Sequence, residues 1–324
     1  MNQQDFISIT KKFVTVLVLL SLIACKNAEN KKSSLNKNAE DSPMFFKMSL
    51  AQWSLHKAIL EDGMNPFDFA KEASALDIHA IEYVSQLYKK EVSRLGLDAV
   101  IYRLNEESKK YGVKNLLIMV DGEGDLANTD ENKLHEAIEN HKKWVDAAKV
   151  LGCHSIRVNA HGQGTDVEVM ANAVIGLAKL SEYAKTKGIN ILVENHGGYT
   201  SNGDWLATVI QKVNMSNCGT LPDFGNFCLK GSQSINSENC ENAYDIYKGV
   251  KELMPYAKAV SAKSYDFDEN GNQPKIDYTK ILQVVKNAGY SGYIGIEYEG
   301  SNLSEKDGII ATKKLLEKAS KEVK

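Results

Sequence analysis

The sequence predicts a (β/α)₈ barrel, in which eight parallel strands alternate with helices. From residue 45 onward, short apolar runs alternate with longer amphipathic stretches, giving eight units in 280 residues. That length is typical of such a barrel. Three of the apolar runs end in a carboxylate, at Glu194, Asp223 and Glu297, and barrels place their catalytic groups where strands end. A doubly wound open sheet is the alternative, because alternation alone does not show closure, but no G-x-G-x-x-G or G-x-x-x-x-G-K-[ST] motif supports it.

The strands are predicted from short runs of apolar residues, which are typical of strands buried on both faces of a parallel sheet. In chain order they cover residues 45–54, 79–84, 113–120, 155–159, 191–194, 218–223, 259–263 and 293–297.

The helices are predicted from their start and stop signals. Asn65 and Pro66 are typical of a helix start, and Gly112, Gly152 and Gly188 of helix ends. In chain order the predicted helices cover residues 65–76, a stretch ending at 111, 131–151, 166–187, 204–213, a stretch ending near 256, 278–288 and 305–318. The longer segment 224–239 is predicted to be an insertion after the sixth strand.

The N-terminus carries an export signal. Two lysines at 11 and 12 precede the apolar run 13–23, which is too short to span a bilayer. Leu22–Cys25 resembles the lipobox of bacterial lipoproteins, which implies removal of residues 1–24, a lipid on Cys25 and an anchor in the cell envelope; a plain signal peptide is the alternative. With Cys25, the polar, aperiodic residues up to 43 are expected to form a flexible linker, and residues 44–324 the barrel domain.

The composition indicates a globular domain with no nucleic-acid partner. The chain is 43% hydrophobic and 25% charged, with a formal net charge of −3, so it lacks the basic bias of a nucleic-acid-binding protein. Among the other cysteines, at 153, 218, 228 and 240, no metal-binding spacing appears. They are interpreted as small buried apolar side chains, with a bridge between Cys228 and Cys240 as the alternative open to an exported protein.

The polar side chains at the strand ends predict a metal site. The side chains expected to converge there are His56, Glu82, Arg157, Asn159, His161, Glu194, His196, Asp223, Asn226, Lys263 and Glu297. Three carboxylates repel one another unless a cation neutralises them. Oxygen ligands favour Mg²⁺ or Mn²⁺, and a nitrogen ligand would shift the preference toward Mn²⁺, Co²⁺ or Zn²⁺. Such an ion polarises a sugar carbonyl or hydroxyl, and a flanking carboxylate, histidine or lysine can move the proton.

Several of these segments resemble a known family. Residues 49–56, 193–196, 221–226 and 295–297 resemble the sugar phosphate isomerase/epimerase family of xylose isomerase-like TIM barrels, over about residues 45–320. The resemblance implies that Glu194, Asp223 and Glu297 hold the metal and that Glu194 and Glu297 also exchange the substrate proton. Ser261 stands where the family usually has a histidine ligand and is expected to be a weak ligand. Lys263 matches a family lysine that could contact substrate oxygen.

The remaining candidates are assigned to a carbohydrate substrate. These are Trp53, His56, Glu82, Arg157, Asn159, His161 and Asn226; for Trp53 packing is the alternative, and for Arg157 a structural ion pair. The loops after the last two strands contain Asp266, Asp268, Glu269 and Glu299, which would repel a phosphate group. The substrate is therefore predicted to be a non-phosphorylated sugar or keto-sugar.

Three functions follow from this reasoning. The first is a divalent-metal-dependent sugar isomerase or epimerase acting through an enediolate. The second is a lyase or dehydratase that uses the same site on keto-sugars or keto-glycosides, with His196 or Lys263 as the acid–base group. The third is a non-catalytic sugar-binding lipoprotein, which is suggested by Ser261. The sequence leaves the oligomeric state open.

Overall fold

A computed structural model describes residues 44–324 of the chain. The predicted signal peptide, Cys25 and the linker lie outside the described residues, so their prediction stays a prediction. Residues Phe45–Lys324 form one compact unit. Among residues 44–324, every helix is too short or too polar to cross a bilayer.

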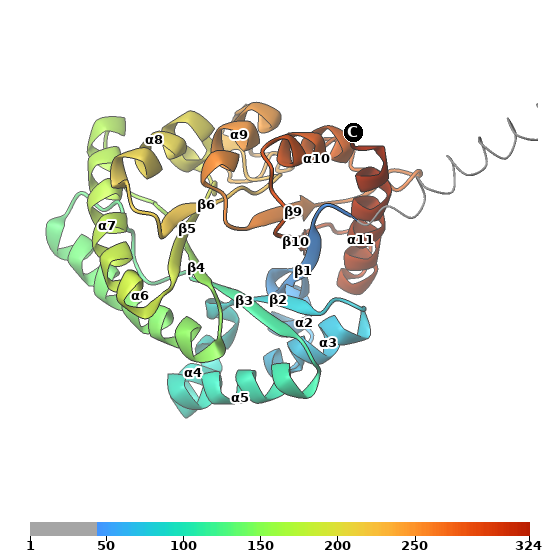
Figure 1. Ribbon diagram of the computed structural model, residues 1–324, viewed down its shortest axis with the longest axis horizontal. Coiled ribbons are helices and arrows are strands. Elements are labelled where there is room, and N and C mark those ends of the chain that lie inside the picture. The colour runs from blue at the N-terminus through green and yellow to red at the C-terminus, as the bar shows by residue number, and fades with distance from the viewer. Residues whose placement is uncertain (1–43) are drawn as a thin grey trace, which may run out of the picture. The chain divides into compact units, whose positions relative to one another are not determined.

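Eight parallel strands form the central sheet, with the helices around them (Figure 1). The strands are β1 (Lys47–Ala51), β2 (Ala80–Val84), β3 (Lys114–Met119), β4 (Ser155–Val158), β5 (Asn190–Glu194), β6 (Cys218–Leu221), β9 (Val260–Ser264) and β10 (Tyr293–Tyr298). Their order around the sheet is β6-β5-β4-β3-β2-β1-β10-β9. Each strand therefore lies beside its predecessor along the barrel, and the predicted (β/α)₈ fold is confirmed.

The two edges of the sheet are joined by backbone contacts between β6 and β9. Isolated parallel bridges pair Thr220 with Ala257 and Asp223 with Ser261. Pro222 lies between these bridges and has no N–H to donate, which interrupts the hydrogen-bond ladder there. Its carbonyl nevertheless accepts a hydrogen bond from the N–H of Ser261 (2.9 Å). The barrel closes at this seam, and the closure brings Asp223 beside the strand that carries Ser261.

Most helices follow the predicted ranges closely. They are α2 (His56–Leu60), α3 (Phe69–Ala75), α4 (Lys89–Leu95), α5 (Leu97–Lys110), α6 (Glu131–Leu151), α7 (Asp166–Lys187), α8 (Gly203–Val213), α9 (Ile246–Leu253), α10 (Tyr278–Asn287) and α11 (Glu305–Glu322). The bounds of α6 and α7 are those predicted. Asp130 and Thr165 cap their first turns, and Gly152 and Gly188 end them in the left-handed conformation.

The structure departs from the predicted elements in three places. The first strand ends at Ala51, and a 3₁₀ turn (Gln52–Leu55) takes up the rest of the predicted range. The first predicted helix begins as a 3₁₀ turn (Pro66–Asp68). The helical stretch predicted to end at residue 111 is two helices, α4 and α5, because Gly96 lies between them with φ +82°.

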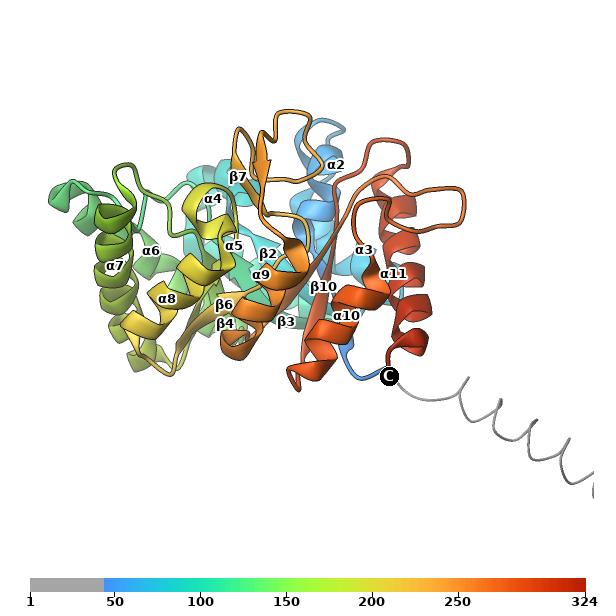
Figure 2. The same ribbon diagram turned by 90° about the horizontal axis from the view of Figure 1, so that it is seen from above.

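The insertion after β6 contains an antiparallel hairpin and a disulfide bond. The hairpin pairs β7 (Cys228–Lys230) with β8 (Asn242–Ala243), and Figure 2 shows β7 on the same side of the barrel as α2. Cys228 and Cys240 form a disulfide across this segment, with Cα atoms 5.8 Å apart. The interpretation of these two cysteines as buried free thiols is wrong, since the hairpin brings them together; Cys153 and Cys218 are free and buried as predicted.

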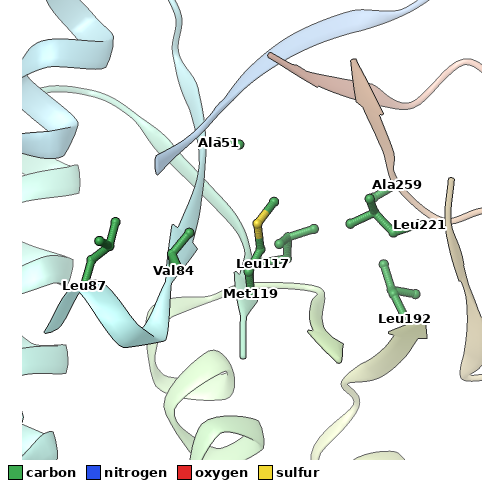
Figure 3. Close-up of a cluster of buried hydrophobic side chains, with 8 residues drawn as sticks. All are labelled: Ala51, Val84, Leu87, Leu117, Met119, Leu192, Leu221 and Ala259. Carbon is green, nitrogen blue, oxygen red and sulfur yellow. The ribbon is translucent and has the colours of Figure 1, made fainter. Parts of the chain in front are cut away.

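A cluster of apolar side chains fills much of the barrel. It comprises Ala51, Val84, Leu87, Leu117, Met119, Leu192, Leu221 and Ala259 (Figure 3). These residues come mainly from β1 to β6. Strands β10, β1 and β2 pair with one another in that order and also place Gly295, Ser49 and Glu82 in the interior. Strands β1 and β2 therefore contribute both apolar side chains (Ala51, Val84) and polar ones (Ser49, Glu82) to the interior.

Candidate functional site

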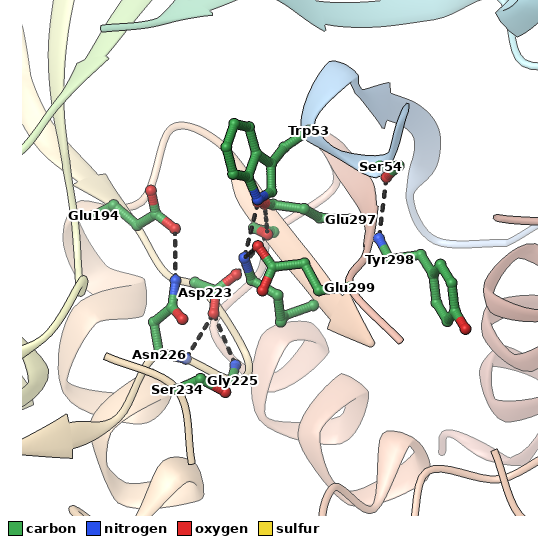
Figure 4. Close-up of polar contacts among 12 residues, drawn as sticks. Trp53, Ser54, Glu194, Asp223, Gly225, Asn226, Ser234, Glu297, Tyr298 and Glu299 are labelled. Atoms are coloured by element: carbon green, nitrogen blue, oxygen red, sulfur yellow. Dashed lines mark hydrogen bonds and ion pairs between the residues drawn. The ribbon is translucent and has the colours of Figure 1, made fainter. Parts of the chain in front are cut away.

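Glu194, Asp223 and Glu297 meet at the carboxyl ends of their strands. Each offers an oxygen within 4.8 Å of the others, and all three side chains are buried. Glu194 ends β5, Asp223 follows β6 by two residues and Glu297 lies near the end of β10. Figure 4 shows the three carboxylates in one group, with Asn226 beside Glu194 and Asp223. The convergence predicted from the sequence is therefore present.

Glu297 is held by two hydrogen-bond donors from β9. The Lys263 ammonium lies 2.8 Å from its Oε1, and the Ser261 hydroxyl lies 2.9 Å from its Oε2. Lys263 also lies 3.1 Å from Oε1 of Glu299. Although burial alone would raise it, the pKa of Glu297 is lowered by Lys263 and then by Ser261. Glu297 is therefore ionised at neutral pH.

Glu194 has weaker partners. Asn226 donates to its Oε1 at 3.2 Å. Arg157 Nε lies 2.8 Å from Oε2, but its N–H is not directed at that oxygen, so the contact is an ion pair without a hydrogen bond. Burial raises the pKa of Glu194 to about 8, with Arg157 opposing the shift. Oε2 has no hydrogen-bond partner among the described residues.

Asp223 is fixed by the backbone of the turn that follows it. Its Oδ1 accepts hydrogen bonds from the backbone N–H groups of Gly225 (2.8 Å) and Asn226 (2.7 Å). Its Oδ2 lies 2.6 Å from the Ser261 hydroxyl. Asn195 holds the turn, because its side chain bonds both the N–H and the C=O of Asp223. Burial raises the pKa of Asp223 to about 6.

The donor set fits a divalent cation. Three buried carboxylates share one small volume, and burial raises the pKa of Glu194 and of Asp223 despite the opposing charges of Arg157 and Lys263. The orphaned Oε2 of Glu194 is an acceptor for which the protein supplies no donor. Oxygen ligands of this kind suit Mg²⁺, Mn²⁺ or Zn²⁺. The set does not identify the metal.

A small cavity of about 170 Å³ has Glu297, one of the three carboxylates, in its wall. It is lined by Trp53, Val84, Gln86, Asp121, Arg157, His196, Gln233, Glu297 and Glu299. Pockets for drug-sized ligands usually span roughly 300–1,000 Å³, so this one suits a ligand the size of one sugar ring. Trp53 stacks on His56, with ring centroids 4.5 Å apart, which presents a fixed aromatic wall.

His196 also lines this cavity. Its Nδ1 is buried and has no hydrogen-bond partner among residues 44–324, and its ring stacks on His161 at 5.8 Å. Burial, then the charge of Arg157, lowers the pKa of His196 well below its usual value. The imidazole is therefore neutral at neutral pH.

Three predicted substrate contacts lie away from the cavity. Glu82 is enclosed in the barrel, where Ser49 donates to its Oε1 at 2.6 Å and burial raises its pKa to about 7. A Cβ on Gly295 would come within 2.7 Å of this carboxylate, so only glycine leaves it room. His56 lies 3.4 Å from Glu305, and Asn159 donates to Asp121 at 2.7 Å.

The other predicted residues lie closer to the carboxylates. Trp53, Arg157 and His196 line the small cavity, and Asn226 contacts Glu194. His161 lines a larger neighbouring cavity. The ligand, catalytic and substrate roles assigned to all of these residues stay predictions.

The structure adds residues that the sequence analysis did not assign to the site. Asp121 accepts a hydrogen bond from Arg157 at 2.8 Å and ends the third strand run, which was a usable signal. Asn195 lies between Glu194 and His196, and its position between two predicted site residues could have identified it. Gln233 comes from the insertion, where nothing in the sequence marks it.

One curated relative shares a short stretch of sequence with this chain. It is the C-glycoside deglycosidase alpha subunit of Arthrobacter globiformis, which is 42% identical over 66 residues. The match spans 19% of this chain and 19% of the relative.

Solved structures share the whole fold at low sequence identity. An L-ribulose 3-epimerase superposes with a TM-score of 0.65 at 14% identity, covering 85% of this chain and 95% of its own. A protein named IOLI with a binding zinc atom superposes with a TM-score of 0.64 at 18% identity, covering 85% and 98%. At these identities the likeness shows the fold alone. The family described as xylose isomerase-like TIM barrel matches residues 70–319, and the chain belongs to that family.

Proposed function

We propose that this protein is a divalent-metal-dependent enzyme that moves a proton next to the carbonyl group of a non-phosphorylated sugar, as a sugar isomerase or epimerase. The observation that carries the proposal is the buried group of Glu194, Asp223 and Glu297, together with a cavity of monosaccharide size that Glu297 lines. The family supports an enzyme of sugar chemistry. The epimerase and the zinc-bound protein among the structural neighbours are consistent with this reaction and cofactor.

Glu194, Asp223 and Glu297 would hold the metal, and Ser261 would orient two of them. The bound ion supplies positive charge where the substrate carbonyl becomes an enediolate. Glu297 is the ionised carboxylate and acts as the base that takes the proton from carbon. Arg157 and Lys263 place positive charge beside Glu194 and Glu297, which stabilises negative charge developing in the cavity.

The isomerase and epimerase outcomes need a second group that returns the proton. Glu194 belongs to the same carboxylate group as Glu297, so a substrate carbon between them can lose a proton to one and regain it from the other. The direct test is exchange of the proton at the carbon next to the ketone for deuterium, followed by NMR in D₂O. The full chain loaded with Mn²⁺ should exchange it, and Glu297→Gln should not.

Product analysis decides between the outcomes of this step. An isomerase or epimerase conserves the substrate mass. Sugar binding that survives a chelator, with no exchange on any keto-sugar, would overturn the catalytic proposal in favour of a binding protein.

A lyase is the second candidate, and the deglycosidase relative favours it. The carbanion formed next to a ketone can expel a substituent from the adjacent carbon. Glu297 would take the proton, the bond to the substituent would break, and the same proton would pass to the departing atom. The products are an unsaturated keto-sugar and the protonated leaving group, so mass spectrometry separates this outcome from isomerisation.

We also propose that the chain is exported and anchored to the cell envelope by a lipid on Cys25. The disulfide between Cys228 and Cys240 supports export, because disulfides persist in oxidising compartments. The test is fractionation of cells carrying the full chain. Wild-type protein should remain with membranes, and Cys25→Ser should lose lipid labelling and leave the membrane fraction.

A further inference from the structure

A second cavity lies next to the one that contains the carboxylates. It has a volume of about 780 Å³, compared with about 170 Å³ for the first. His196 and Gln233 line both cavities, so these two side chains form a shared wall. The two cavities are therefore adjacent, and a ligand bound beside Glu297 lies next to the larger space.

The wall of the larger cavity contains an aromatic pair. Tyr199 and Trp205 stack with ring centroids 5.7 Å apart and planes 19° from parallel, and both line the cavity. Tyr199 is 38% exposed, which leaves part of its ring available to a ligand. Stacked aromatic rings favour a partner with a flat apolar face.

The charged side chains in this wall already have partners. Lys230 pairs with Glu241, and Asp166 accepts a hydrogen bond from the indole N–H of Trp205. The first cavity differs, because Arg157, Asp121, Glu297 and Glu299 surround it. The larger cavity therefore suits an uncharged occupant.

A disulfide bond holds the segment that covers part of the larger cavity. Lys230 and Gln233 lie in the segment closed by the Cys228–Cys240 disulfide. Gln233 packs against Gly197, where an added Cβ would come within 3.2 Å of the Gln233 Cβ and where φ is +93°. Because this segment is already ordered, binding a ligand against it costs less conformational entropy.

We propose that the larger cavity is a second subsite, which binds an uncharged ring joined by a glycosidic bond to the sugar held at the carboxylates. The substrate is then a glycoside and not a free monosaccharide. This inference rests on the proposed function, because it places the keto-sugar at Glu194, Asp223 and Glu297. An aromatic aglycone and a second pyranose both present a flat face to Tyr199, so the experiment includes both.

The experiment measures the affinity of the full chain for three probes by stopped-flow tryptophan fluorescence. Methyl 3-ketoglucoside fills only the first cavity, whereas phenyl 3-ketoglucoside and 3-ketocellobiose carry an aromatic ring and a second sugar. At least one of the ring-bearing probes should bind about 10-fold more tightly than the methyl probe, and the tighter one identifies the occupant. Equal affinities for all three would overturn the subsite.

The Tyr199 variants test where that gain arises. Tyr199→Ala should reduce the gain to about threefold or less and leave the methyl probe within about twofold of wild type. Tyr199→Phe keeps the ring and should keep the gain, although it loses the hydrogen bond to the Gly164 carbonyl. Tyr102→Ala, on the exposed face of α5, is the control. Equal weakening of the methyl and ring-bearing probes by Tyr199→Ala would overturn the assignment.

Deuterium exchange on the methyl probe separates the two proposals. Exchange without a preference for the ring-bearing probes would support the reaction and overturn the subsite. A Tyr199-dependent preference without exchange on any probe would support the subsite and overturn the reaction.

Discussion

The two flanks of the carboxylate group contain similar residues but differ in how well these are bonded. On one flank Arg157 lies between Asp121 and Glu194, and on the other Lys263 lies between Glu297 and Glu299. Both cations lie 2.8 Å from their triad glutamate. The pKa of Glu194 is nevertheless raised to about 8, whereas that of Glu297 is lowered.

Neighbouring charges and hydrogen bonds together account for the difference. Lys263 lowers the pKa of Glu297 by its charge and by a hydrogen bond. The carboxylates of Glu297 and Asp223 add to burial in raising the pKa of Glu194. Lys263 and Ser261 both reach Glu297, and together they outweigh the cost of burying its charge. Arg157 lies near Glu194 but directs no N–H at Oε2, so the burial cost dominates. Distance to a cation alone does not determine the charge state of a buried carboxylate. The surroundings of Glu297 keep its carboxylate ionised. On the other flank, Oε2 of Glu194 is free to bind a metal or a proton.

Replacement of Lys263 should have the largest effect on stability. Lys263→Met leaves Glu297 and Glu299 without their cation in a buried site, and loss of one partner of a buried pair costs about 3–5 kcal/mol. Urea denaturation in chelator should show this loss. Lys187→Met, at the exposed pair with Asp146, is the matched control and should cost less than about 1 kcal/mol. Equal losses would show that the Glu297 flank is not specially stabilised.

The pH dependence of stability should have opposite signs on the two flanks. The raised pKa of Glu194 gives stability that is fully present below the unfolded value of 4.5 and is lost as pH rises toward about 8. The lowered pKa of Glu297 gives stability that is present above 4.5 and is lost as pH falls through its folded value.

Thermal unfolding between pH 3 and 9 in chelator tests this contrast. Glu194→Gln should flatten the alkaline decline, by on the order of 5 kcal/mol, and leave the acid decline in place. Saturating Mn²⁺ should flatten the alkaline decline in the wild type, because the cation favours ionised carboxylates. An alkaline decline unchanged in Glu194→Gln would contradict the assignment.

Removal of one carboxylate should weaken metal binding. Asp223→Asn keeps the size of the side chain but removes a charge from the triad, and we expect a loss of about 100-fold in Mn²⁺ affinity, equal to about 2.7 kcal/mol. Titration calorimetry on the full chain measures this loss. Asp146→Asn, which removes a carboxylate outside the site, should bind Mn²⁺ as the wild type does. Unchanged affinity in Asp223→Asn would exclude this group as the metal site.

Replacement of Ser261 should have the smallest effect on stability, and its effect on Mn²⁺ affinity shows whether the hydroxyl is a metal ligand. Ser261→Ala removes a hydrogen bond shared by Asp223 and Glu297, which should cost about 1–2 kcal/mol in chelator. Its Mn²⁺ affinity should stay within about threefold of wild type, because the hydroxyl serves the carboxylates. A 10-fold loss of affinity would make it a ligand instead. The control for stability alone is Ser264→Ala, on the same strand as Ser261. It removes a buried hydrogen bond between Ser264 and Thr312.

Local signals in the sequence were enough to predict much of the fold. The bounds of α6 and α7 follow from capping residues and terminal glycines within a few positions of each helix end. The meeting of Glu194, Asp223 and Glu297 was predictable because parallel strands in a barrel all end on one face. The alternation of strands and helices left an open sheet as the alternative, and the strand order in the structure decides for the barrel.

Contacts between distant segments decided the rest. The Cys228–Cys240 disulfide depends on the hairpin of the insertion, and Glu82 is enclosed because Gly295 on β10 leaves it space. The charge states of Glu194 and Glu297 depend on the direction of single N–H and O–H groups from β4 and β9. The sequence by itself therefore determined that Glu194, Asp223 and Glu297 meet at one site. Only the tertiary structure decided which of them are ionised, enclosed or open to a ligand, because burial and hydrogen-bond direction arise from packing between residues far apart in the chain.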